Sequence, residues 1–197
     1  RYLVYGRADF IAQNRDVMEE LKDVGLEAVI VGVESIRDKD LYDYNKKTSR
    51  ETNEKAIQIL RELGIELYAT MIIPLDFSRD DFRELTGWLR RMKVTFVNLQ
   101  PLTPLPGTSI FEEYRDRLLY DTTEHHVFDM AHVVLRPERM SVRMFYVRLL
   151  FSYYRVVTRP VNIFRLVRKY GFGSNFRMLK GSQMVALQYM KKIVRGY

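Results

Sequence analysis

The stretch Leu26-Glu-Ala-Val-Ile-Val-Gly-Val33 is almost continuously apolar and is rich in β-branched residues. A strand of this kind is expected where helices cover both faces of a parallel sheet, or where a barrel closes. Similar runs occur at residues 2–5, 65–73 and 94–100. We therefore predict strands at all these positions.

Amphipathic stretches separate the predicted strands, and each one begins at a residue suited to start a helix. The expected starts are Asn14, Thr48 with Glu51 at capping-box spacing, and Ser78 with Asp81. Glycines at 25 and 64 fit as stops after the first two helices. Strands that alternate with helices of this length indicate βαβ units and a parallel sheet, so the fold class is α/β.

A different pattern follows residue 100. Prolines at 101, 104 and 106 predict a rigid turn before a short helix near residues 110–115. A long helix is expected at 140–157, and Thr158-Arg159-Pro160 should end it and start another. One face of the long helix is expected to pack in the core or between helices: Met144, Val147, Leu150, Phe151 and Tyr154.

The charge of the chain is divided between two parts. Residues 136–197 carry 14 Lys and Arg against one acid, whereas residues 1–135 carry 18 bases against 24 acids. Such an asymmetry is a sign of different surroundings. We therefore divide the chain into an α/β part, 1–135, and a basic, aromatic helical extension, 136–197.

The composition also excludes several kinds of site. The 197 residues include no cysteine, so this chain can ligate neither an iron–sulfur cluster nor a zinc–thiolate centre. No apolar run approaches the ~18 residues of a transmembrane helix, and we expect a cytoplasmic protein. His125, His126 and His132 lack the spacing of a metal site, so we predict no bound metal on these residues.

Glu34 and Ser35 directly follow the strand at 26–33. In parallel α/β folds, ligands lie at the carboxyl ends of strands, and a carboxylate beside a hydroxyl can hold a sugar diol. Alternatively, Glu34 begins a solvated loop and pairs with a nearby arginine. Lys46 precedes a helix start and can meet an anion there, or it belongs to a solvated pair with Lys47.

These segments together resemble a known family. Val31-Gly-Val-Glu-Ser35, Asn45-Lys-Lys-Thr48 and Ile57-x-x-Leu-Arg-Glu-Leu-Gly64 are similar, in order and spacing, to the middle of radical SAM enzymes. Leu102-Thr-Pro-Leu-Pro-Gly-Thr108 is similar to a turn in their cobalamin-binding-domain class. That class includes methyltransferases and cyclases acting on lipids and tetrapyrroles, and the resemblance covers residues 1–135.

The resemblance implies a TIM-barrel-like half: a partial parallel (β/α) barrel of about four βα units with a helical C-terminal extension. It further implies that Glu34 and Ser35 lie against the ribose of S-adenosylmethionine (SAM) and that Lys46 faces the SAM carboxylate. The backbone at Met71-Ile72-Ile73 would flank the adenine, and Arg7 would look into the same cavity.

Two departures from the family pattern affect these expectations. Pro74-Leu-Asp-Phe-Ser78 replaces a glycine-rich motif, which puts adenine placement there in doubt because proline lacks an N–H. The cysteines that hold the [4Fe-4S] cluster in the family are missing from this chain. We therefore expect a parent enzyme that uses SAM, the cluster and, if the class holds, cobalamin, with this fragment inactive alone.

The partners follow from the same reasoning. The parent would act on a small molecule or a lipid- or tetrapyrrole-like substrate. Residues 136–197 could meet an anionic membrane surface, with nucleic acid less favoured because no RNA-module signature is present. An uncovered strand at 2–5 predicts either a homodimer caused by the missing half-barrel or a strand edge that the helical tail covers by folding back. The alternative function is a non-catalytic α/β module whose basic tail binds membranes or nucleic acid.

Overall fold

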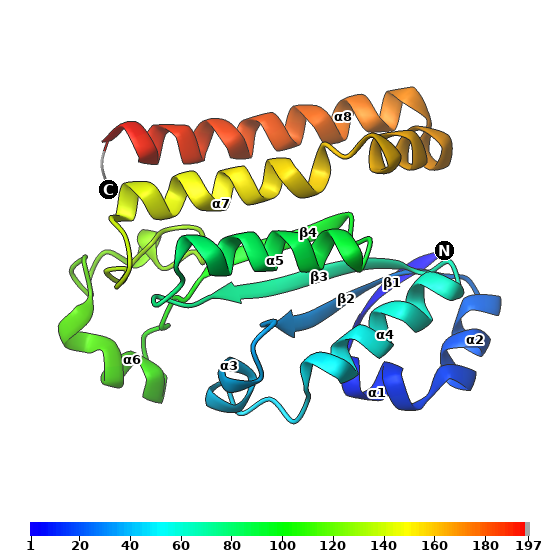
Figure 1. Ribbon diagram of the computed structural model, residues 1–197, viewed down its shortest axis with the longest axis horizontal. Helices are drawn as coiled ribbons and strands as arrows, with labels where there is room; N and C mark the ends of the chain where they lie inside the picture. Colours follow the sequence, from blue (N-terminus) through cyan, green and yellow to red (C-terminus); the bar gives the residue numbers. More distant parts are fainter. Residues whose placement is uncertain (196–197) are drawn as a thin grey trace. The chain divides into compact units, whose positions relative to one another are not determined.

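The computed structural model describes residues 1–195, apart from the side chains of Val161, Ser174, Met178, Leu179, Ser182 and Arg195 (Figure 1). The strands are β1 (Tyr2–Gly6), β2 (Leu26–Glu34), β3 (Glu66–Ile73) and β4 (Phe96–Pro101). The α-helices are α1 (Ala8–Gln13), α2 (Arg15–Asp23), α3 (Asp38–Asp43), α4 (Arg50–Glu62), α5 (Arg79–Arg91), α6 (Ser109–Tyr114), α7 (Val142–Val157) and α8 (Pro160–Arg195). Short 3-10 helices are η1 (Arg115–Arg117) and η2 (His125–Val127).

The chain forms two compact units. The first contains Arg1–Ile73 and Gly87–Gln100, and the second contains Pro74–Thr86 and Pro101–Tyr197. The division therefore cuts α5 after Thr86.

The first unit is built on a four-stranded sheet in the order β1-β2-β3-β4. The pairs β1–β2 and β2–β3 are parallel, and helices connect the strands. This arrangement confirms the predicted α/β partial barrel of about four βα units with C-terminal helices. All four predicted strands are present within two residues of the predicted ends, whereas the short helices α1 and α3 were not predicted.

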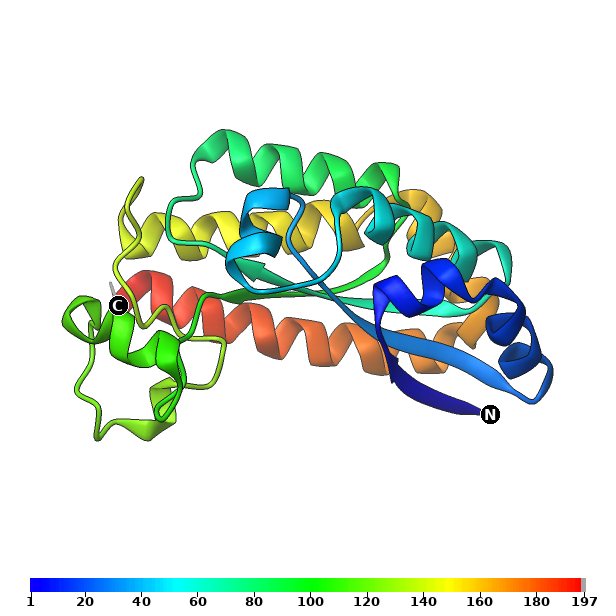
Figure 2. The same cartoon turned by 90° about the horizontal axis from the view of Figure 1, so that it is seen from below.

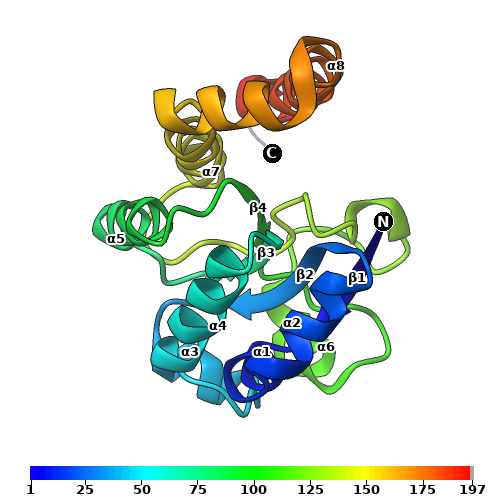
Figure 3. The same ribbon diagram turned by 90° about the vertical axis from the view of Figure 1, so that its right-hand side faces the viewer.

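Helices α1, α2 and α4 lie on one side of this sheet (Figure 3). They cover the alternate residues Val29, Val31 and Val33 of β2, which are buried, while Ile30 between them is half-buried. Close packing explains the glycine at the end of β1: a Cβ on Gly6 would lie 2.7 Å from Val29 Cγ1 of β2 and 3.2 Å from Ile11 Cδ1 of α1. Strand β2 therefore buries one face more fully than the other, although its sequence is apolar on both faces.

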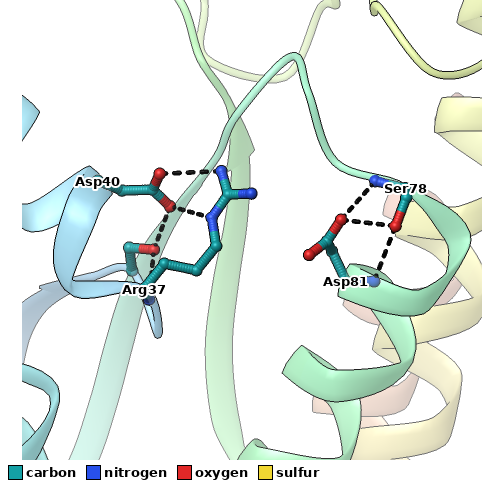
Figure 4. Close-up of polar contacts among 5 residues, drawn as sticks. Arg37, Asp40, Ser78 and Asp81 are labelled. Carbon is teal, nitrogen blue, oxygen red and sulfur yellow. Dashed lines mark hydrogen bonds and ion pairs between the residues drawn. The ribbon is translucent and has the colours of Figure 1, made fainter.

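Side-chain caps fix the starts of α4 and α5. Ser49, rather than the predicted Thr48, caps α4, and its Oγ accepts from the amide of Thr52. The predicted box at α5 is confirmed: the Ser78 amide donates to Asp81 at 2.8 Å, and the Asp81 amide donates to the Ser78 hydroxyl at 3.2 Å (Figure 4).

An aromatic cluster lies in the core of the second unit. Phe82 makes edge-to-face contacts with Phe77 and Phe145, each with ring centroids 5.4 Å apart. Next to them the buried hydroxyl of Thr86 donates to Ser152 at 3.3 Å. These contacts join the first half of α5 to α7 within this unit.

The buried face of α7 differs from the predicted one. Its buried residues are Phe145, Tyr146, Leu149, Ser152 and Val156. The expected packing face instead exposes Val147, Phe151 and Tyr154. That expectation was wrong because α7 has apolar residues on both sides, so periodicity alone could not choose between them.

Helix α8 bends at Gly171, whose φ of 71° and ψ of 169° are not helical. Beyond the bend, α8 runs back beside α7, as both Figure 1 and Figure 2 show. The contact is aromatic: the Tyr189 ring lies 5.8 Å from the Tyr146 ring and 6.2 Å from the Tyr153 ring. Among the described residues, no helix combines the length and apolarity needed to cross a bilayer.

Candidate functional site

Glu34 ends β2 in a conformation that is unusual for a residue with a side chain. Its φ is 63°, in the left-handed region that favours glycine. The β2–β3 register also shifts between Gly32 and Glu34, so that Glu34 pairs with Met71. Strain of this kind costs roughly 1–3 kcal/mol and is concentrated at functional sites. Glu34 is therefore the first candidate for a ligand-binding group.

The Glu34 side chain turns back over its own strand. A Cβ built on Gly32 would lie 2.4 Å from Glu34 Oε1, so the carboxylate occupies the space that the missing side chain leaves. Lys46 Nζ lies 2.9 Å from the same oxygen. Gly32 thus admits the carboxylate, and Lys46 holds it at the carboxyl end of β2.

Ser35 belongs to a buried polar cluster beside Glu34. Its hydroxyl donates to Asp40 Oδ2 at 2.6 Å and accepts from the amide of Arg37. The Arg37 guanidinium binds both oxygens of Asp40, at 2.8 and 2.9 Å (Figure 4). This bidentate pair fixes the loop that follows Glu34, so in this structure Ser35 positions the loop.

Helix α4 supports the same strand end from the covered side. The buried amide of Asn53 donates to the carbonyl oxygen of Val33 at 3.0 Å. The start of α4 already has protein acceptors for some of its amides, because Arg50 N donates to Asp38 and Thr52 N donates to Ser49. Lys46 therefore meets the Glu34 carboxylate rather than standing alone at a helix start.

The remaining predicted site residues lie at different depths. Arg7 is exposed and pairs with Asp9 at 2.7 Å, which raises the pKa of Arg7 and lowers that of Asp9 mainly through their side-chain hydrogen bond. Met71 and Ile73 are buried, and Ile72 between them is half-buried. Among the predicted site residues, the structure therefore brings only some together. Glu34 and Lys46 are in direct contact, and Met71 is the register partner of Glu34.

Sequence reasoning missed Arg37, Asp40 and Asn53. The first two had a weak signal, an Arg and an Asp at the (i, i+3) spacing that allows ion pairs on a helix. Asn53 had no such signal in the sequence, because a buried side-chain amide that donates to a strand carbonyl follows no sequence pattern. The described residues contain no cluster of three metal-ligating side chains, and His132 contacts Asp129 at 2.9 Å.

This arrangement offers one carboxylate at the carboxyl end of a strand in a partial barrel. The positive φ of Glu34 and the missing side chain at Gly32 place the carboxylate, and Lys46 holds it by an ion pair. A carboxylate accepts about four hydrogen bonds. Such a group suits a ligand with neighbouring hydroxyls.

Comparisons with known proteins agree with the resemblance seen in the sequence. No family model matches the chain. It is 30% identical over 146 residues to the hopanoid C-3 methylase of Methylococcus capsulatus, which covers 74% of this chain and 28% of the methylase. It is 28% identical to bacteriochlorophyllide d C-8(2)-methyltransferase of Chlorobaculum tepidum, over 72% of this chain and 32% of that enzyme.

A solved structure of the cobalamin-dependent S-adenosylmethionine radical enzyme OxsB is 21% identical. The matched part covers 59% of this chain and 17% of that protein, with a TM-score of 0.42. The chain spans about a third or less of the length of the curated relatives. The two curated relatives are a methylase and a methyltransferase, which agrees with the class that the sequence motifs resemble. The chain therefore belongs to the radical SAM superfamily, in the class that contains a cobalamin-binding domain.

Proposed function

We propose that this chain is the part of a radical SAM enzyme that binds SAM, with Glu34 holding the ribose hydroxyls. The single observation that carries the proposal is the strained Glu34, whose carboxylate lies over Gly32 and against Lys46 at the carboxyl end of β2. A parallel α/β barrel binds its ligands at this end of the strands. Family membership supplies SAM as the ligand.

Each residue of the site has a separate task in this proposal. Glu34 accepts hydrogen bonds from the ribose, and Lys46 fixes the carboxylate and adds positive charge for the SAM carboxylate. Arg37 and Asp40 keep the loop after Glu34 in place. The half-buried Ile72 contributes apolar surface beside the adenine.

The [4Fe-4S] cluster does not fit on residues of this chain. It contains no cysteine, so thiolate ligands for a cluster come from outside these 197 residues. The cluster would supply the electron for reductive cleavage of SAM. We therefore propose that the chain alone is inactive and that the complete protein is an oxidoreductase or methyltransferase.

The substrate class is proposed from the relatives. A hopanoid methylase and a bacteriochlorophyllide methyltransferase are named for large, mostly apolar molecules. We propose a lipid- or tetrapyrrole-like substrate for the complete protein.

The test is production of 5′-deoxyadenosine from SAM by the full-length protein, reconstituted without oxygen and reduced with dithionite. We expect product from the full-length protein and none from the 197-residue chain. A full-length protein that carries a cluster but releases no 5′-deoxyadenosine would contradict the proposal. Product from the chain alone would contradict its inactivity.

A further inference from the structure

We propose that the exposed faces of α7 and α8 bind the surface of an anionic lipid bilayer. The proposal concerns the second unit and does not depend on SAM binding at Glu34. It rests on exposed apolar side chains at helical spacing and on the charge of the two helices.

The straight part of α8 after Gly171 carries an exposed apolar stripe. Its members are Phe172, Phe176, Leu187, Met190 and Val194, all exposed. At about 3.6 residues per turn these positions lie on one face of the helix. The two phenylalanines are 81% and 70% exposed, and Val194 is 76% exposed, so this stripe meets solvent rather than the core.

Helix α7 adds a second exposed apolar group. Val147, Phe151 and Tyr154 are exposed on the side of α7 opposite its buried residues. The Arg155 guanidinium lies 5.6 Å from the Phe151 ring, and Lys169 Nζ of α8 lies 5.2 Å from the Tyr170 ring. Cations beside aromatic rings suit the interface between lipid headgroups and acyl chains.

The charge of the two helices determines the partner. Helix α7 carries three bases and α8 carries eight, and neither carries an acid. On α8, Lys180 and Lys191 fall on one border of the apolar stripe at helical spacing. A basic amphipathic helix binds in the interface of a bilayer, with apolar residues inserted and bases at the anionic headgroups.

The aliphatic part of the stripe favours lipid over nucleic acid. Single-stranded nucleic acids bind by stacking bases on aromatic rings in a basic groove. Leu187, Met190 and Val194 are exposed beside the phenylalanines and cannot stack with bases in this way. Aromatic and aliphatic side chains can both insert among the acyl chains of a bilayer.

The experiment is flotation of the chain with phosphatidylcholine vesicles, with and without phosphatidylglycerol, at about 0.05 and about 0.5 M salt. The charge variant is Lys180→Glu/Lys191→Glu, and its control is Lys39→Glu/Lys55→Glu, which changes the net charge equally at exposed sites of the first unit. The apolar variant is Phe172→Gln/Phe176→Gln. Its control is Tyr5→Gln/Tyr42→Gln, at sites that are 83% and 84% exposed.

We expect binding to anionic vesicles that falls at high salt and is weak on pure phosphatidylcholine. One base at a surface of this kind changes the partition coefficient about fivefold, so the charge variant should lose about 30-fold or more. The apolar variant should also lose binding, and both controls should bind like wild type. Circular dichroism establishes that all variants are folded.

Three results would overturn the proposal. The first is equal binding to neutral and anionic vesicles, and the second is equal loss in the variants and their controls. The third is absence of vesicle binding while the chain binds single-stranded RNA in an anisotropy assay or self-associates through the stripe in light scattering.

Discussion

Replacing Gly32 with alanine should separate the stability of the protein from its affinity for SAM. The new methyl group would lie 2.4 Å from Glu34 Oε1 and 3.6 Å from Lys46 Nζ. Both neighbours are ends of flexible side chains, so they can move without disturbing the sheet. The substitution therefore displaces the Glu34 carboxylate and leaves the strand in place.

The expected effect on stability is small. Alanine in place of glycine reduces the entropy of the unfolded chain, which stabilises by about 0.4–1 kcal/mol. Loss of the Glu34–Lys46 pair costs about 0–1 kcal/mol, because the Lys46 side chain is 42% exposed and screened by water. These contributions nearly cancel, and the melting temperature should change by less than about 4 °C.

The expected effect on SAM affinity is large. Loss of charge-assisted hydrogen bonds to the ribose costs roughly 1.5–3 kcal/mol, or about one to two orders of magnitude in dissociation constant. Calorimetric titration of the full-length protein with SAM measures this change, and thermal unfolding measures stability.

Gly64→Ala is the matched control for this prediction. Its φ is +67° and nothing lies within 4 Å of the added Cβ, so it should destabilise by roughly 1–2 kcal/mol and leave SAM affinity unchanged. Unchanged SAM affinity in Gly32→Ala would refute the reasoning, and so would equal effects of the two variants on affinity.

Three further predictions concern the cap, the buried tyrosines and the cluster. Ser49→Ala removes the side-chain acceptor for the Thr52 amide, so thermal unfolding should show a loss of about 1 kcal/mol; an unchanged melting temperature would contradict this role. Burial raises the pKa of Tyr146 and Tyr189 above the ordinary 10.0, so stability should fall as pH rises above about 10, where the unfolded phenols ionise first. A titration followed by tyrosinate absorbance should then show two groups that ionise at higher pH than the rest, and the double variant Tyr146→Phe/Tyr189→Phe should lack them. Simultaneous ionisation of all tyrosines in the folded protein would contradict the prediction. The chain alone should bind no stoichiometric iron after anaerobic reconstitution, since it has no thiolate, and a cluster absorbance with matching iron and sulfide would refute this.

The strands of the fold could be predicted from the sequence because each is a mostly apolar run, rich in β-branched or aromatic residues, next to helix signals. The carboxyl end of β2 could be chosen as a candidate ligand site for the same reason: Glu34 ends such a run. The positive φ of Glu34 could not be predicted, because only glycine, and sometimes asparagine, indicates that conformation in a sequence. The contact of Glu34 with Lys46 depends on the path of the loop between them, which no local pattern specifies.

The face on which each residue of β4 lies could not be predicted either. Tyr68 pairs with Ile30 in register and stacks on Phe96, with ring centroids 6.4 Å apart. Phe96 therefore shares the face of Ile30, and Val97 lies on the other face of β4. A shift of one residue in strand phase reverses every side chain, and a uniformly apolar strand gives no sign of its phase.

The contact between Glu34 and the ribose is tested most directly by a thermodynamic cycle. SAM and its 2′-deoxy analogue are titrated into wild-type full-length protein and into Glu34→Ala. If Glu34 binds the ribose, the wild type should bind the analogue about one to two orders of magnitude more weakly than SAM. Glu34→Ala should then discriminate little between the two ligands. An equal loss of affinity for the analogue in both proteins would show that Glu34 does not contact the ribose.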